Sequence, residues 1–166
     1  MVNIDSKVND IIKSTEYIDY VDNDLFEFAS NYVKYVFEIY SIPKNRLTKT
    51  QVRGMLDISA HSINVTGTKL KDLCDNRVKK QTNEQTIEMW KELYNLFDIS
   101  KDSWKQIIKI NKKTPKEFID FYINEELTKD EKNSLKNILF AYLMNKFCIH
   151  FYSEYIYVKA IKGERN

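Results

Sequence analysis

Glycine and proline are scarce in this chain, which has three glycines and two prolines among 166 residues. Both residue types mark turns, and a β-sandwich or barrel needs many turns, so their scarcity disfavours an all-β domain. Cysteine is equally rare. Cys74 and Cys148 lie too far apart for a metal-binding or redox motif, and the N-terminus shows no signal peptide. We therefore expect reduced thiols in the core of a cytoplasmic protein.

A strong charge of one sign is also lacking, because 26 Lys and Arg side chains face 24 Asp and Glu, giving a net charge of +2. No overall field would attract a nucleic acid, so any basic surface must come from local segregation of charge. The balance of 43% hydrophobic and 30% charged residues is typical of a globular protein. Polar residues such as Lys146 and Glu154 interrupt the apolar-rich stretch 138–161, which excludes a membrane span. We expect one domain over residues 1–166, with no membrane partner.

Catalytic motifs are absent from the sequence. It has no glycine-rich phosphate loop, no nucleophile elbow and no H-E-x-x-H pattern. The two histidines, His61 and His150, are far apart and have no acidic or cysteine neighbour at metal-ligand spacing. We expect His61 on a helix surface and His150 at the edge of the core. The sequence therefore predicts no enzymatic activity, no metal and no cofactor.

Helical signals, in contrast, occur along the whole chain. Four T-x-x-E/Q patterns stand before apolar residues at helical spacing, and such capping boxes mark helix N-termini. They begin at Thr48, Thr82, Thr114 and Thr128. Residues 22–24 and Ser100 are two more candidate helix starts. No segment shows sustained period-two alternation, so we predict an all-α fold: a compact helical bundle of five to seven helices. Its longest helix runs from Thr128 to about Lys162 and ends at Gly163.

Basic residues gather around two of these predicted helices. One group lies in the loop and first turns of the helix that begins near Thr48, and another opens the following helix. The two groups are Lys44, Arg46, Lys49 and Arg53, and then Lys69 and Lys71. Such groups suit contacts to a phosphate backbone, which require charge and geometry but no base-edge code. They are equally compatible with ordinary solvated helix faces.

The stretch 46–59, RLTKTQVRGMLDIS, also has a helix-turn-helix interpretation. Its apolar residues fall where the first helix and turn of that motif need them. However, Arg53 stands where the motif needs a small residue, and Thr66 stands where the recognition helix needs an apolar one. Without close contact between the two helices, the second cannot be held in the DNA groove. These two positions argue against the motif, so we keep a regulator that binds double-stranded DNA only as an alternative.

Both ends of the chain resemble one protein family. The stretch Leu47-Thr48-Lys49-Thr50-Gln51-Val52-Arg53 resembles the leucine-threonine and arginine signature of the small subunit of type III-A CRISPR–Cas (Csm) effector complexes. Lys146-Phe147-Cys148, Tyr157-Val158-Lys159 and Gly163 resemble that family's final helix. The middle of the family carries a tyrosine and alanine-glycine-arginine segment, which this chain lacks.

The resemblance implies a non-catalytic, RNA-binding structural subunit of an antiviral ribonucleoprotein. Small subunits of this family are helical bundles that stack along the guide RNA–target RNA duplex and line its groove with basic residues, while other subunits cleave. By motif, Lys49, Arg53 and Lys159 carry over as RNA-binding residues. Lys44, Arg46, Lys69 and Lys71 are added from the position of their charge alone. The implied partners are RNA, other effector subunits and further copies of the chain.

A second alternative is a helical interaction protein, encoded by a virus or phage, that inhibits a single protein target. The stretch 103–108, SWKQII, resembles the tryptophan motif of Bcl-2-like folds. That fold needs a long apolar helix after the tryptophan. Here the sequence NKKTP at 111–115 interrupts the helix after about two turns, because proline ends helices.

Overall fold

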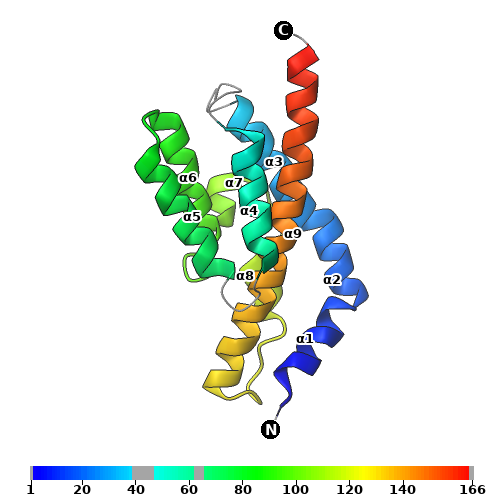
Figure 1. Cartoon of the computed structure of the whole chain (residues 1–166). Coiled ribbons are helices and arrows are strands. Elements are labelled where there is room, and N and C mark those ends of the chain that lie inside the picture. Colours follow the sequence, from blue (N-terminus) through cyan, green and yellow to red (C-terminus); the bar gives the residue numbers. More distant parts are fainter. Residues whose placement is uncertain (1, 39–46, 62–65, 165–166) are drawn as a thin grey trace.

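The computed structural model describes residues 2–38, 47–61 and 66–164 (Figure 1). All regular structure in these residues is helical, which confirms the predicted all-α class. The elements are α1 (Ile4–Ile12), α2 (Thr15–Asp19), the π-helical segment η1 (Tyr20–Leu25), α3 (Phe26–Glu38), α4 (Lys49–His61), α5 (Thr66–Lys80), α6 (Glu84–Leu96), α7 (Trp104–Ile108), α8 (Pro115–Asp120) and α9 (Lys129–Glu164). Because α2, η1 and α3 follow one another without a break, the described part of the chain forms eight helical rods, one more than the predicted maximum.

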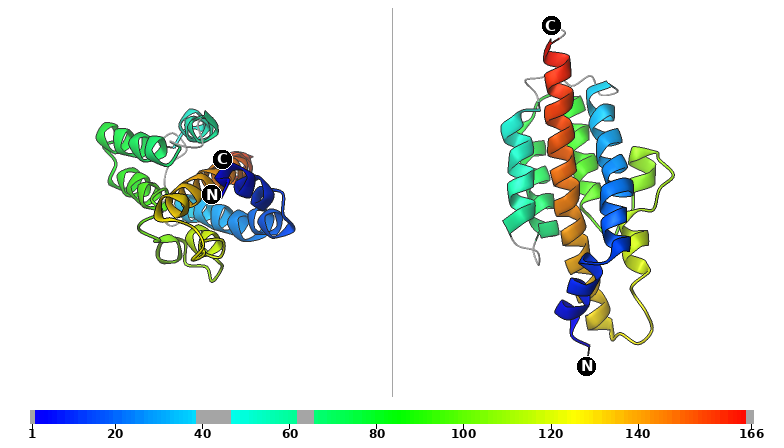
Figure 2. Two further views of the ribbon diagram at one scale, coloured as in Figure 1. Left: turned by 90° about the horizontal axis from the view of Figure 1, so that it is seen from below. Right: turned by 90° about the vertical axis from the view of Figure 1, so that its right-hand side faces the viewer.

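Helix α9 is the central element, as predicted, and its 36 residues span about 54 Å. It contacts α1, η1, α3, α4, α5 and α8. Figure 2 shows these helices arranged around it, with its C-terminal turns extending beyond them. Since α9 has neighbours on several sides, apolar residues line more than one of its faces. The buried ones include Leu139, Leu143, Met144, Phe147, Phe151 and Tyr155. The helix continues one residue past Gly163, where we expected it to end.

The aromatic residues join the helices that surround α9. Trp104 of α7 is fully buried, and its indole Nε1 donates a hydrogen bond to the carbonyl oxygen of Leu96, 3.0 Å away. Its ring lies edge-on to Phe28 of α3 at 5.4 Å and to Phe147 of α9 at 5.0 Å. Helix α7 has only five residues, too few for a helix to be stable alone. Its packing against α3 and α9 therefore holds it in place.

Three of the predicted capping boxes hold helix N-termini. At α4 the hydroxyl of Thr48 accepts from the N–H of Gln51 at 3.2 Å, and Gln51 Oε1 accepts from the N–H of Thr48 at 3.1 Å. Thr128 and Glu131 make the same reciprocal pair at α9, at 3.1 and 2.9 Å. At α8, Thr114 accepts from the N–H of Glu117, and Pro115 occupies the first turn.

The other predicted helix starts are wrong. At α6 the cap is Asn83, whose side chain accepts from the N–H of Thr86 at 3.0 Å, so the Thr82 box does not form. Ser100 caps no helix; its hydroxyl instead donates to the carboxylate of Asp98 at 2.6 Å. Residues 22–24 lie inside η1, because the helix continues through them from α2 into α3. Serine, asparagine and aspartate all bond to nearby backbone or side chains, so a neighbouring residue can take the role of cap.

The π-helical segment lies against α9. A π-helical turn contains an extra residue and is often found where a helix meets a specific partner. Here His150 Nε2 lies 3.0 Å from the carbonyl oxygen of Val21, and His150 is half-buried, as expected for the edge of the core. Burial lowers the pKa of the His150 imidazole, so the ring is neutral near pH 7, and its Nε2–H donates a hydrogen bond to that carbonyl. Across the described ranges, no helix is both long and apolar enough to cross a lipid bilayer.

Candidate functional site

The start of α4 lies beside the C-terminal half of α9, and each of the two helices carries basic side chains there. Leu47 is buried, and its carbonyl oxygen accepts a hydrogen bond from the hydroxyl of Tyr155. This contact fixes the first turn of α4 against α9. We call the surface formed by Lys49, Arg53, Tyr152 and Lys159 the α4–α9 surface.

Two cations on the α4–α9 surface lie over tyrosine rings of α9. The guanidinium of Arg53 is 5.7 Å from the centre of the Tyr152 ring, and Lys159 Nζ is 5.5 Å from the centre of the Tyr155 ring. Such contacts position a cation while leaving its outer side open to an anion. The Arg53 side chain is 58% exposed, so it stays accessible to solvent beside Tyr152.

Arg53 also has an acidic neighbour. Its Nε lies 3.1 Å from Asp57 Oδ1, one turn further along α4. Hydrogen bonds to Asp57 and to Tyr152 raise the pKa of the Arg53 guanidinium. The guanidinium has five N–H donors, so the Asp57 contact leaves several of them for a further partner. Asp57 therefore competes with any phosphate at this position but does not block it.

The N-terminus of α4 offers fewer free N–H groups than the sequence suggests. Helix N-termini attract phosphate because their first N–H groups have no partner within the helix. The hydroxyl of Thr48 already takes the N–H of Gln51, and the Thr48 carbonyl takes that of Val52. At most the N–H groups of Lys49 and Thr50 are left for an anion. The side chains must therefore supply most of the attraction.

Lys69 and Lys71, two further predicted residues, do not join this surface. Lys69 and Lys71 open α5, which follows the far end of α4, and the 13 residues of α4 span about 20 Å. Lys69 is exposed, whereas Lys71 lies 3.8 Å from Asp98 and has a side chain only 29% exposed, so it ties α5 to the end of α6. Lys44 and Arg46 lie outside the described residues.

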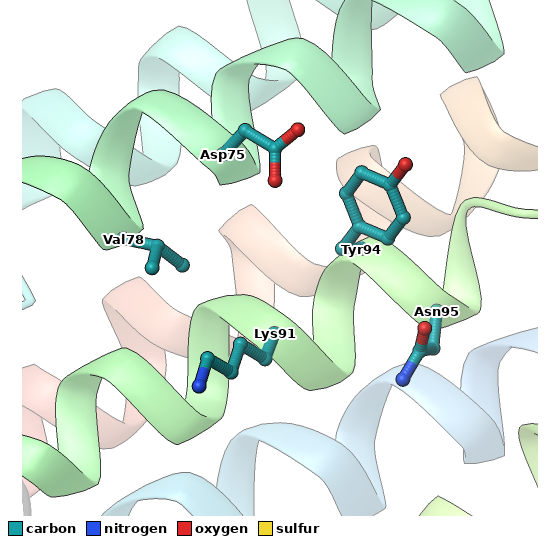
Figure 3. A pocket seen from close by; sticks show the side chains of 5 residues that line it. All are labelled: Asp75, Val78, Lys91, Tyr94 and Asn95. Atoms are coloured by element: carbon teal, nitrogen blue, oxygen red, sulfur yellow. The ribbon is translucent and has the colours of Figure 1, made fainter.

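A pocket of about 270 Å³ lies between α5 and α6 (Figure 3). Asp75 from α5 and Tyr94 from α6 point toward the same space, and Lys91 also lines the pocket. The Tyr94 ring lies near two ammonium groups, Lys71 at 5.8 Å and Lys101 at 5.4 Å. Sequence reasoning missed Tyr94 and Lys101, since nothing in the local pattern reveals a contact between separate elements.

Each histidine lies beside a backbone carbonyl oxygen, and both cysteines are buried. His61 is exposed, as expected, and its Nδ1 lies 2.8 Å from the carbonyl oxygen of Asp57 in the same helix. Cys74 and Cys148 are buried free thiols, also as expected. Burial raises the pKa of both, that of Cys148 to about 12, which suppresses the reactive thiolate. Within residues 2–38, 47–61 and 66–164, no three His, Cys, Asp or Glu side chains gather as a metal site.

Comparison of the chain with protein-family models, with curated proteins and with solved structures gives no match in any of the three.

Proposed function

We propose that this chain is a non-catalytic RNA-binding subunit of a CRISPR–Cas ribonucleoprotein effector, and that the α4–α9 surface contacts the RNA phosphate backbone. One observation carries the proposal. Arg53 comes from the first motif of the resemblance and Lys159 from the last, and both lie over tyrosine rings on the C-terminal half of α9. Lys49, also of the first motif, is exposed one helical turn before Arg53 on α4. Lys69 and Lys71, which were chosen by charge alone, lie elsewhere.

The surface suits a backbone contact rather than the reading of a sequence. Arginine binds phosphate through a planar fork of N–H groups, and lysine contributes a mobile point charge. Neither the tyrosine rings beneath them nor Asp57 presents a row of groups that could read base edges. Affinity should therefore depend steeply on salt and little on the RNA sequence.

The test is binding of a labelled RNA duplex to the wild-type chain and to Lys49→Ala, Arg53→Ala and Lys159→Ala across a salt series. Loss of one phosphate contact lowers the slope of log affinity against log salt by about one unit. Lys129→Ala is the matched control, because this exposed lysine lies on the same helix about 45 Å from Lys159.

A second variant tests the role of Arg53 in the opposite direction. Asp57→Asn removes the carboxylate that competes for the guanidinium, so the affinity for RNA should rise by a factor of about two to five. The proposal fails if Arg53→Ala, with its helical content intact, keeps the wild-type affinity and salt slope. Selective binding of one double-stranded DNA sequence would instead support the helix-turn-helix alternative.

Membership of an effector complex is tested separately by the genomic neighbourhood. A neighbouring gene for the signature large subunit and a CRISPR repeat array would support it. Phage structural genes in that position would favour the inhibitor alternative.

A further inference from the structure

A second pocket, of about 310 Å³, lies on another side of α9, and the proposed function does not use it. Residues of α1, α2 and η1 form one wall and residues of α9 the other. Ile12, Ile18 and Val21 supply apolar surface, and Tyr17, Tyr142 and Lys146 supply polar groups. A pocket of this size with apolar walls and a few polar groups suits a small organic ligand.

Tyr17 is the unusual residue of this pocket. It is only 4% exposed, and within the described ranges its hydroxyl has no hydrogen-bond partner. Burying a hydroxyl without a partner is unfavourable, so such groups call for an explanation. Tyr20, one turn further on, shows the ordinary arrangement, since its hydroxyl donates to the carbonyl oxygen of Lys113 at 2.8 Å. The hydroxyl is closed to solvent, so a ligand atom that accepts its hydrogen bond would have to enter between Tyr17 and its neighbours in the pocket wall.

Three side chains of the lining can donate hydrogen bonds to a ligand, and one, Asp22, is an acidic acceptor. Tyr17 and Tyr142 carry phenolic hydroxyls, and Lys146 carries an ammonium that takes part in no ion pair of the described residues. The Nδ2 donor of Asn145, which also lines the pocket, is occupied by the hydroxyl of Ser59 at 3.0 Å. The donors of Tyr17, Tyr142 and Lys146 suit a ligand with acceptor oxygens.

The other charged neighbours do not cancel this preference. Asp22 lies at the rim and is exposed, so solvent screens its charge. His150, one turn beyond Lys146 on α9, is neutral near pH 7 because burial lowers its pKa. Lys146, a half-buried residue, is therefore the positive charge that an anionic ligand would meet at the pocket.

We propose that this pocket binds a small monocarboxylate that bears an apolar chain or ring. The carboxylate accepts hydrogen bonds from the Tyr17 hydroxyl and the Lys146 ammonium, and the apolar part packs against Ile12, Ile18 and Val21. Charge-assisted hydrogen bonds of this kind are stronger than those between neutral groups. The site is independent of RNA binding, since it uses none of the residues of the α4–α9 surface.

The experiment is isothermal titration of the full chain with phenylpropionate, and with phenylpropanol and phenylpropylamine as probes of the same skeleton. Saturable binding of one phenylpropionate is expected, at least about tenfold tighter than that of the alcohol or the amine. Tyr17→Phe deletes only the unpartnered hydroxyl, so it should leave the melting temperature unchanged or raised and weaken binding about fivefold to tenfold. Lys146→Met keeps the aliphatic length of the side chain and should weaken binding further.

Two control variants separate the pocket from general effects. Tyr20→Phe removes a partnered hydroxyl outside this pocket, and Lys136→Met removes a charge elsewhere on α9; both should bind phenylpropionate as the wild type does. The proposal is overturned if the folded wild-type chain shows no saturable binding at millimolar phenylpropionate, or if phenylpropanol binds equally well. It is also overturned if Tyr17→Phe and Lys146→Met both keep the wild-type affinity.

Discussion

Replacing Ser59 or Asn145 should loosen the contact that sets α4 against α9. Asn145 Nδ2 donates to Ser59 Oγ at 3.0 Å, and the Ser59 hydroxyl in turn donates to the carbonyl oxygen of Leu56 at 2.7 Å. Ser59 is only 2% exposed, so this is a buried polar link between the two helices. Polar links of this kind fix the register of two helices because any shift leaves their atoms unpaired. Arg53 lies on the same helix, so its place over Tyr152 depends on that register.

The expected cost follows from the burial of the pair. A hydrogen bond of this kind contributes about 0.5–1.5 kcal/mol net, and a buried group left unpaired adds its desolvation penalty. Ser59→Ala leaves the Asn145 amide without its acceptor and removes a partner of the Cys148 thiol, so we expect a loss of about 1–2 kcal/mol. Asn145→Ala regains helix propensity and should cost less, about 0.5–1.5 kcal/mol. For a chain of this length, 1 kcal/mol corresponds to roughly 2–4 °C in melting temperature.

The assay is urea unfolding followed by circular dichroism for the wild type, both single variants and the double variant. The double-mutant cycle should give a coupling energy of about 0.5–1.5 kcal/mol, with equal urea dependence in all four proteins. The control cycle combines Asn133→Ala with Ser59→Ala. Asn133 is exposed near the N-terminal end of α9, so the coupling energy between Asn133 and Ser59 should be near zero. A Ser59–Asn145 coupling below about 0.3 kcal/mol would refute the role given to the pair.

Trp104→Phe removes the indole donor from the buried Leu96 carbonyl and leaves a cavity, so the free energy of unfolding in urea should fall by about 2–4 kcal/mol. A fall below about 1 kcal/mol would contradict this packing. Burial lowers the pKa of His150, so between that lowered value and its ordinary value of about 6.5 the unfolded chain takes up a proton that the native chain does not. The free energy of unfolding should therefore fall as the pH is lowered from about 7, and His150→Gln should flatten this profile; an unchanged profile would exclude the histidine as its cause. Cys74 and Cys148 should react with a thiol reagent only slowly in the native chain and completely in denaturant, because burial raises both pKa values. Rapid labelling of the native chain would show that the thiols are accessible.

Local signals in the sequence predicted the fold best where one residue pair decides the structure. The boxes at Thr48 and Thr128 formed as predicted, because each needs only two side chains three residues apart. Thr82 failed because Asn83 competes for the same turn and caps the helix one residue later. Residues 22–24 could not be recognised as helix interior, since the contact that accompanies the π-helical segment comes from His150, far along the chain.

The candidate site was predictable only in part. Arg53 and Asp57 are one helical turn apart, so their pairing could be expected from spacing alone. The Tyr152 ring beneath Arg53 and the link from Lys71 to Asp98 depend on how separate helices pack, which no local pattern contains. The sequence therefore indicated which cations are available, whereas the fold decides which of them share a surface.

The central place of α9 has a consequence for the order in which the chain folds. Synthesis runs from the N-terminus, so α3, α4 and α5 exist before the helix on which all three pack. Their apolar faces stay uncovered until α9 has been synthesised. The contacts of α9 to η1 and α1 also join distant residues, such as Val21 and His150, which are 129 positions apart. Closing such large loops before any contact is gained slows folding relative to bundles with neighbouring partners. The half-made chain therefore exposes helices with unpaired apolar faces, a state prone to aggregation during synthesis.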